Sequence, residues 1–143
     1  MNELIEGYLR TGGVRYFRGH HDDEYFFLVD ARAGRLYVHL EVNGAKKDAV
    51  RIDITPDRYY PAAHRDELLH EVQRWNDEAH GIGALIGRSC DPQLAGVSAG
   101  SVYHGTGSGE FGAFVDNSIA AATELFERIR LAVEPRQPLR DAG

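Results

Sequence analysis

Hydrophobic residues recur with a helical period in three stretches of the chain, and with a period of two between those stretches. The helical period covers the first ten residues, residues 68–79 and residues 111–133. Side chains three and four positions apart share one face of a helix. These stretches therefore predict three amphipathic helices, each with one face suited to a hydrophobic core.

Alternating hydrophobic and polar positions predict strands, because neighbouring side chains of a strand point to opposite faces of a sheet. The alternation is clearest in residues 36–42, and residues 50–54 repeat it after the turn-forming pair Asn43-Gly44. This pattern predicts a hairpin. The six predicted strands comprise residues 14–19, 25–30, 35–42, 50–54, 84–90 and 97–104.

Prolines and glycines set the expected boundaries of these elements. Pro56 and Pro61 are predicted to end sheet pairing, so that an aromatic loop crosses to the second helix. Gly81 is a candidate stop for that helix. The last helix has several possible starts, at Asp116, Asn117 or an earlier glycine.

The order of elements is therefore α-β-β-β-β-α-β-β-α, which predicts the α+β class. We expect an antiparallel sheet of five to six strands, covered on one face by three helices. Residues 1–133 form a single domain in this interpretation, and the proline-containing residues 134–143 form a disordered tail.

Composition narrows the classes of function. The chain has 143 residues, which suffice for one domain, and its net charge is −6 with no basic segment, so we expect no nucleic-acid partner. An apolar run long enough to span a bilayer is absent from the sequence, and the first ten residues do not resemble a signal peptide. A lone cysteine, Cys90, forms no internal disulfide. We therefore expect a cytoplasmic protein without a membrane partner.

Two motifs are candidates for ligand binding. Residues 107–112 read Gly-Ser-Gly-Glu-Phe-Gly, but the dinucleotide fingerprint needs a following parallel strand, and no strand is predicted after this helix. The tip His20-His21-Asp22-Asp23 offers metal ligands, although adjacent side chains diverge and a closed zinc site needs four ligands. A flexible connection between strand and helix explains the first motif better than nucleotide binding does, and a solvated hairpin tip explains the second as well as a metal site does.

Catalytic interpretations of the sequence are weaker. Cys90 could act with His80 or His104 as its base, but a lone cysteine is more often a small buried hydrophobe. The carboxylates of Glu67, Glu71 and Glu78 fit the solvated face of the second helix. We therefore predict that the protein is not an enzyme and has no catalytic, cofactor-binding or metal-binding residues.

Four residues are candidates for contact with a partner. Tyr59 and Tyr60 lie between two prolines, and tyrosine suits surfaces where an apolar ring meets water; alternatively, they close the end of the core. Trp75 and Asn76 end the hydrophobic stripe of the second helix. Trp75 could anchor a partner, but its register with Leu68 favours the core.

The second helix also carries a family resemblance. Residues 68–76, Leu-Leu-His-Glu-Val-Gln-Arg-Trp-Asn, resemble the helix of YbjN-domain proteins, and residues 25–30 and 36–40 resemble strands of that family. The resemblance spans roughly residues 2–133. It implies a type III secretion chaperone-like α+β fold and a small, dimeric sensory transduction regulator without a known catalytic site. Chaperones with the related fold bind extended segments of client proteins.

Together these observations predict a non-catalytic protein-interaction or chaperone-like regulatory module that forms a homodimer and binds a polypeptide partner. The alternative is a regulator that binds a small ligand or a metal, through the glycine-rich loop 105–112 or the His20-His21 tip.

Overall fold

A computed structural model describes residues 1–105 and 107–133, with Arg88 described by its backbone alone. The predicted tail, residues 134–143, lies outside the described residues. The elements are α1 (Asn2–Thr11), β1 (Phe17–Arg18), β2 (Glu24–Ala31), β3 (Gly34–Asn43), β4 (Ala49–Pro56), β5 (Tyr60–Pro61), a 3₁₀ turn (Ala62–His64), α2 (Arg65–Asp77), β6 (Gly83–Arg88), β7 (Leu94–Tyr103) and α3 (Ser108–Val133).

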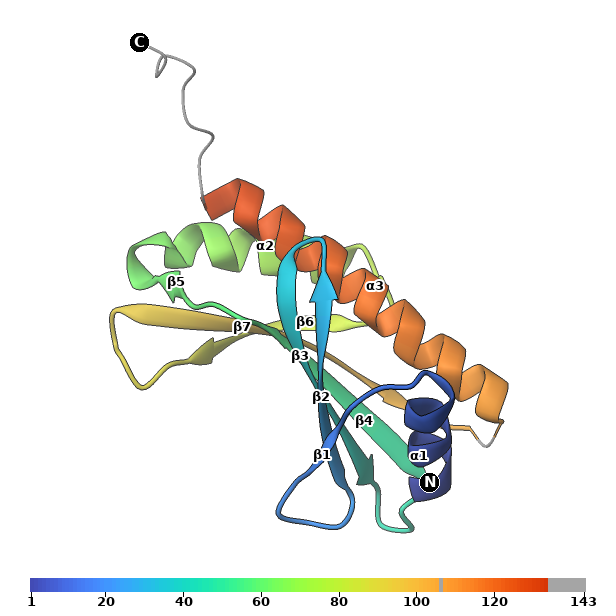
Figure 1. Cartoon of the computed structure of the whole chain (residues 1–143). Coiled ribbons are helices and arrows are strands. Elements are labelled where there is room, and N and C mark those ends of the chain that lie inside the picture. The colour runs from blue at the N-terminus through green and yellow to red at the C-terminus, as the bar shows by residue number, and fades with distance from the viewer. Residues whose placement is uncertain (106, 134–143) are drawn as a thin grey trace.

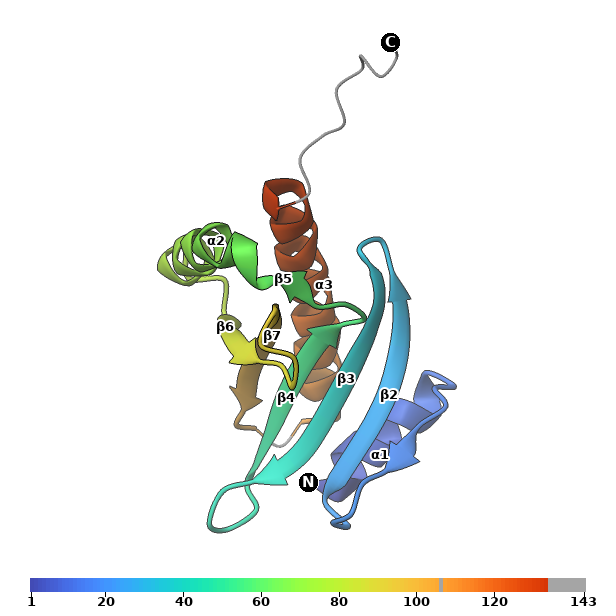
Figure 2. The same ribbon diagram turned by 90° about the vertical axis from the view of Figure 1, so that its left-hand side faces the viewer.

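The strands form one antiparallel sheet in the order β1-β2-β3-β4-β7-β5, and β6 also pairs with β7. The long helix α3 crosses one face of this sheet, with α1 and α2 near its two ends (Figure 1). Figure 2 looks onto the sheet from the side opposite α3, where no helix covers the central strands. This arrangement confirms the predicted α+β class.

The core lies between the sheet and the helices. Alternate strand residues are buried on the helical side, among them Leu40 of β3 and Ile52 of β4. Phe111 and Phe126 of α3 pack against that side and are also buried. Burial of large apolar side chains dominates the stability of such a fold.

Each of the two prolines ends a strand, but sheet pairing resumes between them at β5, contrary to the expectation of an unpaired aromatic loop. Pro56 is the last residue of β4 and pairs with Leu36, and Pro61 belongs to β5 and pairs with Leu94. Proline is tolerated at strand ends and bulges, where a missing N–H does not interrupt a ladder. The described residues therefore form seven strands instead of five to six. The extra strand, β5, has only two residues.

Other boundaries shift by a few residues. β1 is limited to Phe17–Arg18 within the predicted run 14–19, and α3 begins at Ser108, after the earlier glycine instead of at Asp116 or Asn117. In the part of the chain that is described, no helix combines the length and the hydrophobicity needed to cross a membrane.

Candidate functional site

The four residues predicted to contact a partner lie in different environments. Tyr60 and Trp75 are core residues, with 2% and 0% of their surface exposed. Tyr59 is 58% exposed. Asn76 is exposed in part, but its side chain hydrogen-bonds the backbone of Ala84. Tyr59 is therefore the one aromatic ring of this set that a partner can reach.

Trp75 and Asn76 hold the end of α2 against β6. The Trp75 indole Nε1–H donates to the Ile82 carbonyl at 3.0 Å, and His80 stacks on the ring with 3.6 Å between centroids. The Asn76 amide donates to the Ala84 carbonyl at 3.0 Å, and its oxygen accepts from the Ala84 N–H at 2.8 Å. These contacts give both residues a structural role.

Tyr59 lies where the sheet is interrupted beside β7. The ladder between β4 and β7 ends at the pair Ile54–Ala99, and the ladder between β5 and β7 resumes at Tyr60–Ala95. Five residues on one side therefore stand opposite three on the other, which makes a bulge. We call residues 55–59 the bulge.

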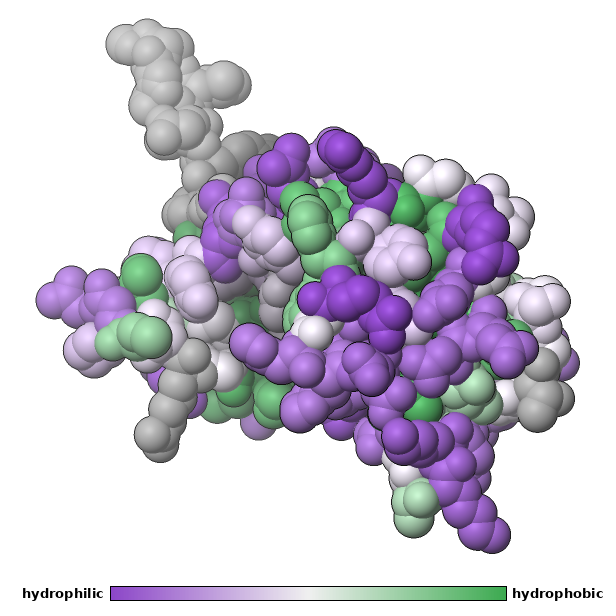
Figure 3. Space-filling view, turned by 60° about the horizontal axis from the view of Figure 1, so that its bottom comes forward, coloured by the Kyte–Doolittle hydropathy of each residue, from purple (hydrophilic) through white to green (hydrophobic). Residues whose placement is uncertain are grey.

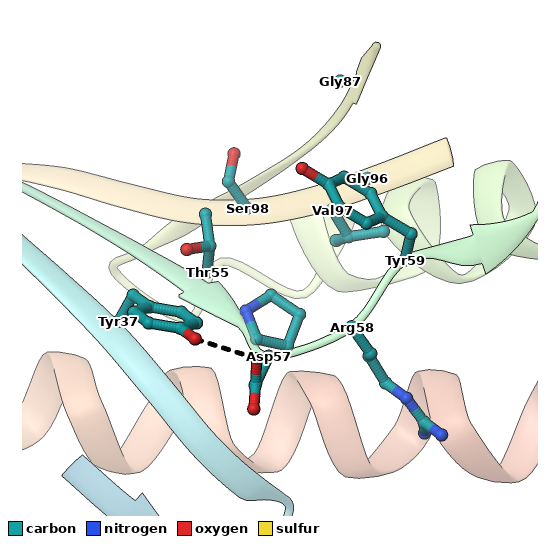
Figure 4. A pocket seen from close by; sticks show the side chains of 10 residues that line it. Tyr37, Thr55, Asp57, Arg58, Tyr59, Gly87, Gly96, Val97 and Ser98 are labelled. Carbon is teal, nitrogen blue, oxygen red and sulfur yellow. Dashed lines mark hydrogen bonds between the residues drawn. The ribbon is translucent and has the colours of Figure 1, made fainter. Parts of the chain in front are cut away.

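The bulge borders a groove of about 470 Å³ on the uncovered face of the sheet (Figure 4). Its floor includes the cross-strand glycine pair Gly87–Gly96. A Cβ atom at Gly96 would lie 3.3 Å from Cε1 of Tyr59, so the absence of a side chain there lets the Tyr59 ring lie against the backbone. On the other side, the Tyr37 hydroxyl donates to Asp57 at 2.9 Å. The lining residues are Tyr37, Thr55, Pro56, Asp57, Arg58, Tyr59, Gly87, Gly96, Val97 and Ser98.

The polar side chains of the groove offer hydrogen bonds to a ligand. The hydrogen bond to Asp57, and repulsion by its charge, raise the pKa of Tyr37, so that its phenol stays protonated and oriented. Thr55 and Ser98 add hydroxyl groups between the two tyrosine rings. Among the described residues that line the groove, neither a histidine nor a cysteine is present to act as a base or nucleophile.

A second hollow, of about 420 Å³, adjoins the groove at Pro56, Asp57 and Arg58. Three more arginines line it, one from the β2–β3 turn, one from the start of β3 and one from the last turn of α3. We call this site the arginine hollow. Its four arginines are Arg32, Arg35, Arg58 and Arg130. Sequence analysis missed it because these residues are far apart in the chain, and only the sheet register brings them together.

The structure also brings together a histidine and two carboxylates that the sequence did not indicate. Glu24, His39 and Glu41 lie on β2 and β3 with potential ligand atoms within 4.8 Å of one another, and could hold a metal ion. His39 Nε2 already hydrogen-bonds Glu24 at 3.1 Å, and its ring stacks on Phe26. Asp53 lies 3.8 Å from the other ring nitrogen.

Of the two candidate motifs of the sequence, the glycine-rich loop lies apart from these sites, whereas the His20-His21 tip adjoins Glu24, whose carboxylate accepts from the His21 N–H at 3.4 Å. His20-His21 is at the β1–β2 loop, at an end of the molecule where hydrophilic residues cover much of the surface (Figure 3). Neither histidine belongs to a group of three potential metal ligands among the described residues. Gly109 and Gly112 border a hollow of about 590 Å³ next to Asp116, whose carboxylate accepts from Tyr8 at 2.7 Å. A carboxylate at this position opposes phosphate binding.

Cys90 is exposed, so the interpretation of this residue as a small buried hydrophobe is wrong. It follows the end of β6 in a short turn, where packing does not bury it. His80, one of its proposed bases, is stacked on Trp75 and bonded to Glu78. Glu71 and Glu78, which were expected on a solvated face, both pair with Arg128 of α3.

An antiparallel sheet with helices on one face and an open opposite face defines a small α+β protein, and comparison with known proteins gives its family. The sequence model of the YbjN family, described as "Putative bacterial sensory transduction regulator", matches residues 2–131. The chain belongs to the YbjN family.

Two solved structures share the fold. The crystal structure of E. coli YbjN, described as "a putative transcription regulator", aligns with a TM-score of 0.67 and 12% identity over 88% of each chain. An uncharacterized protein from Methanothermobacter thermautotrophicus aligns with a TM-score of 0.57 and 10% identity, over 92% of this chain and 98% of that one. No curated protein matches significantly. At these identities the likeness concerns the fold alone.

Proposed function

We propose that this protein is a non-catalytic regulatory module that binds an extended polypeptide segment in the groove between Tyr37 and Tyr59. The observation that carries the proposal is the opening of the sheet at the bulge. It exposes the Gly87–Gly96 floor between two partly exposed tyrosine rings, on the face that no helix covers. Aromatic rings beside exposed backbone suit a peptide, because rings bind side chains while backbone and hydroxyl groups bind the peptide chain.

The proposal includes a homodimer in the cytoplasm. The exposed thiol of Cys90 agrees with a reducing compartment. Exposed hydrophobic side chains on the open face, Phe26 and Leu28 of β2 among them, are candidates for the contact between copies. Light scattering coupled to size-exclusion chromatography measures the mass directly, and a monomer across the accessible concentration range would remove this part of the proposal.

A substitution that fills the groove without disturbing the fold tests peptide binding. A Cβ atom at Gly87 meets no heavy atom within 4 Å, so Gly87→Gln adds a side chain to the groove floor without a clash. Leu85→Gln is the matched control, because Leu85 is 64% exposed two residues earlier on β6 and does not line the groove.

The measurement is selection of a random peptide library on the immobilised wild-type chain. We expect selected peptides to bind the wild type and Leu85→Gln equally, and to lose binding to Gly87→Gln and Tyr59→Ser. Circular dichroism and thermal melting establish that the four proteins fold alike. Peptides that bind Gly87→Gln and Tyr59→Ser as well as wild type, or no selection at all, would exclude the groove as the binding site.

A second candidate function is regulation by a divalent cation, favoured by the convergence of Glu24, His39 and Glu41. An ion at 100 times its dissociation constant raises the free energy of unfolding by about 2.7 kcal/mol. Thermal melting with Zn²⁺ or Mn²⁺ tests this, with His39→Ala expected to abolish the increase in Tm and His20→Ala to leave it unchanged. Equal melting with and without the metals removes this candidate.

A further inference from the structure

The arginine hollow is connected to the peptide groove by the backbone of the bulge. Asp57 N–H donates to the Arg35 carbonyl at 3.0 Å, which fixes the bulge against the first residues of β3. Pro56, Asp57 and Arg58 border both cavities. A segment bound in the groove at Asp57 therefore lies next to the arginine hollow.

Three separate elements supply the four guanidinium groups of this hollow. Arg32 lies in the tight turn that the pair Ala31–Gly34 closes, Arg35 follows this turn in β3, and Arg58 belongs to the bulge. Arg130 comes from the last turn of α3, and the β2–β3 turn lies at that same end of the molecule in both ribbon views (Figures 1 and 2). In a chain of net charge −6, four arginines around one cavity are a local reversal of charge.

The carboxylates near the hollow do not cancel this basic character. Arg35 pairs with Asp30 at 3.3 Å, but both side chains are largely exposed, and such pairs contribute little to stability. Arg130 hydrogen-bonds Glu127, whose pKa is lowered chiefly by this bond, with a smaller effect of Arg32. A guanidinium has five N–H donors, so Arg35, which donates to Asp30 through Nε, keeps donors for a second carboxylate.

We infer that the polypeptide bound in the groove carries carboxylates next to its hydrophobic residues, and that the arginine hollow binds them. This inference rests on the proposed function. The planar fork of arginine matches a carboxylate in two parallel hydrogen bonds, which is the recognition that four converging guanidinium groups favour. Asp57 lines the hollow, and Asp30 and Glu127 pair with two of its arginines, so the basic surface is small and suits a short acidic stretch better than a long polyanion such as RNA.

The probes are two fluorescein-labelled peptides that join Leu-Tyr-Leu to either Glu-Glu-Glu or Gln-Gln-Gln. Anisotropy titrations with the full-length protein measure the two dissociation constants. At low salt we expect the glutamate peptide to bind about tenfold more tightly, and we expect the ratio to approach one in about 0.5 M NaCl, where charges are screened.

The variant Arg32→Gln/Arg35→Gln tests the source of this preference, because both side chains are exposed at the β2–β3 hairpin end. We expect it to bind the two peptides with nearly equal affinity. Arg10→Gln/Arg74→Gln is the matched control; it removes the same charge from α1 and α2, lines neither cavity, and should keep the full preference. A third variant, Arg130→Gln, should lower the preference in part.

The outcomes separate the inference from the function on which it rests. Equal binding of both peptides to the wild type, with binding lost in Gly87→Gln, overturns the acidic preference and leaves the groove intact. A preference that persists in Arg32→Gln/Arg35→Gln overturns the assignment to the arginine hollow. Tighter binding of a short single-stranded RNA than of the glutamate peptide also overturns it. Absence of binding by both peptides, together with a failed library selection, removes the proposed function itself.

Discussion

Trp75 and Asn76 are adjacent in the sequence but stabilise the structure through different contacts. The indole is buried and gives its single donor to a carbonyl that would otherwise be unpaired in the core. The Asn76 amide presents one donor and one acceptor to the backbone of Ala84, as a neighbouring strand would. The hydrogen bonds of the two residues therefore explain how the end of α2 is held against the start of β6.

Removing the Asn76 amide is expected to weaken this junction. In Asn76→Ala, the Ala84 N–H and carbonyl both lose their partner, which costs about 1–3 kcal/mol in the free energy of unfolding. Urea denaturation followed by circular dichroism measures the loss. Gln73→Ala, at an exposed position of the same helix, is the control and should change stability by less than about 0.5 kcal/mol. Equal stability of the two variants would contradict the role given to the amide.

Truncation of Trp75 should be more severe. Trp75→Ala removes a fully buried ring that stacks on His80 and hydrogen-bonds Ile82, with an expected loss of about 3–5 kcal/mol. Because this variant can fail to fold, Trp75→Phe provides a second measurement in which the ring volume is largely kept and the hydrogen bond is lost. We expect its denaturation midpoint to lie between those of wild type and Trp75→Ala. A stability near that of wild type for both would contradict a core position.

At the scale of elements, the helices and the long strands were predictable because their hydrophobic periods are complete. Residues 36–42 alternate without interruption, and β3 and β4 pair as expected from Asn43-Gly44. β5 and the bulge were not predictable, because they depend on how two strand ends meet β7. The groove arises from that mismatch. Tyr59 could be predicted as a contact residue because it is a tyrosine between two prolines, whereas Tyr37 and the Gly87–Gly96 floor could not be predicted.

The end of α2 provides a test of backbone strain. Gly81 is a left-handed residue, with φ +82°, but α2 ends at Asp77, and the first left-handed residue after it is Ala79, with φ +56°. Because a Cβ atom is unfavourable in this region, Ala79→Gly should raise the free energy of unfolding by about 0.5–1 kcal/mol.

Gly81→Ala makes the opposite change, because it adds a Cβ atom at a left-handed residue. Nothing lies within 4 Å of a Cβ atom there, so the expected loss of about 1 kcal/mol reflects strain without a clash. Urea denaturation compares both variants with wild type. A destabilised Ala79→Gly together with an unaffected Gly81→Ala would contradict this account of the helix end.

At the scale of the whole molecule, charge was the property that sequence reasoning described least completely. The net charge of −6 and the absence of a basic segment describe the whole sequence, and they do not show where charged side chains gather on the surface. The fold places Arg32 and Arg58 beside Arg130, and Glu24 beside His39, across large separations in sequence. Such clusters depend on the register between paired strands and on how α3 crosses the sheet, and the hydrophobic periodicity of the sequence determines neither.

The contact of α2 with α3 makes the stability of the whole molecule depend on pH. Arg128 of α3 donates to both carboxylate oxygens of Glu78, at 2.7 and 3.3 Å, and with a further hydrogen bond from His80 it lowers the pKa of Glu78 from 4.5 to about 2. A carboxyl group whose pKa is lower in the folded state binds a proton more weakly there than in the unfolded chain. Its contribution to stability is therefore complete above pH 4.5 and is lost as the pH falls toward 2.

Thermal melting across this pH range tests the dependence, with Glu78→Gln as the variant and Asp77→Asn as the control at the same helix end. We expect wild type to melt above Glu78→Gln at neutral pH, and the difference in Tm to shrink between pH 4.5 and 2, because protonation removes the charge that the variant lacks. Among the described residues, the carboxylates that pair with Arg128 are those of Glu71 and Glu78, so Asp77→Asn should follow wild type throughout. A difference in Tm that stays constant over this range would show that the Glu78 carboxylate acts through packing and not through its charge.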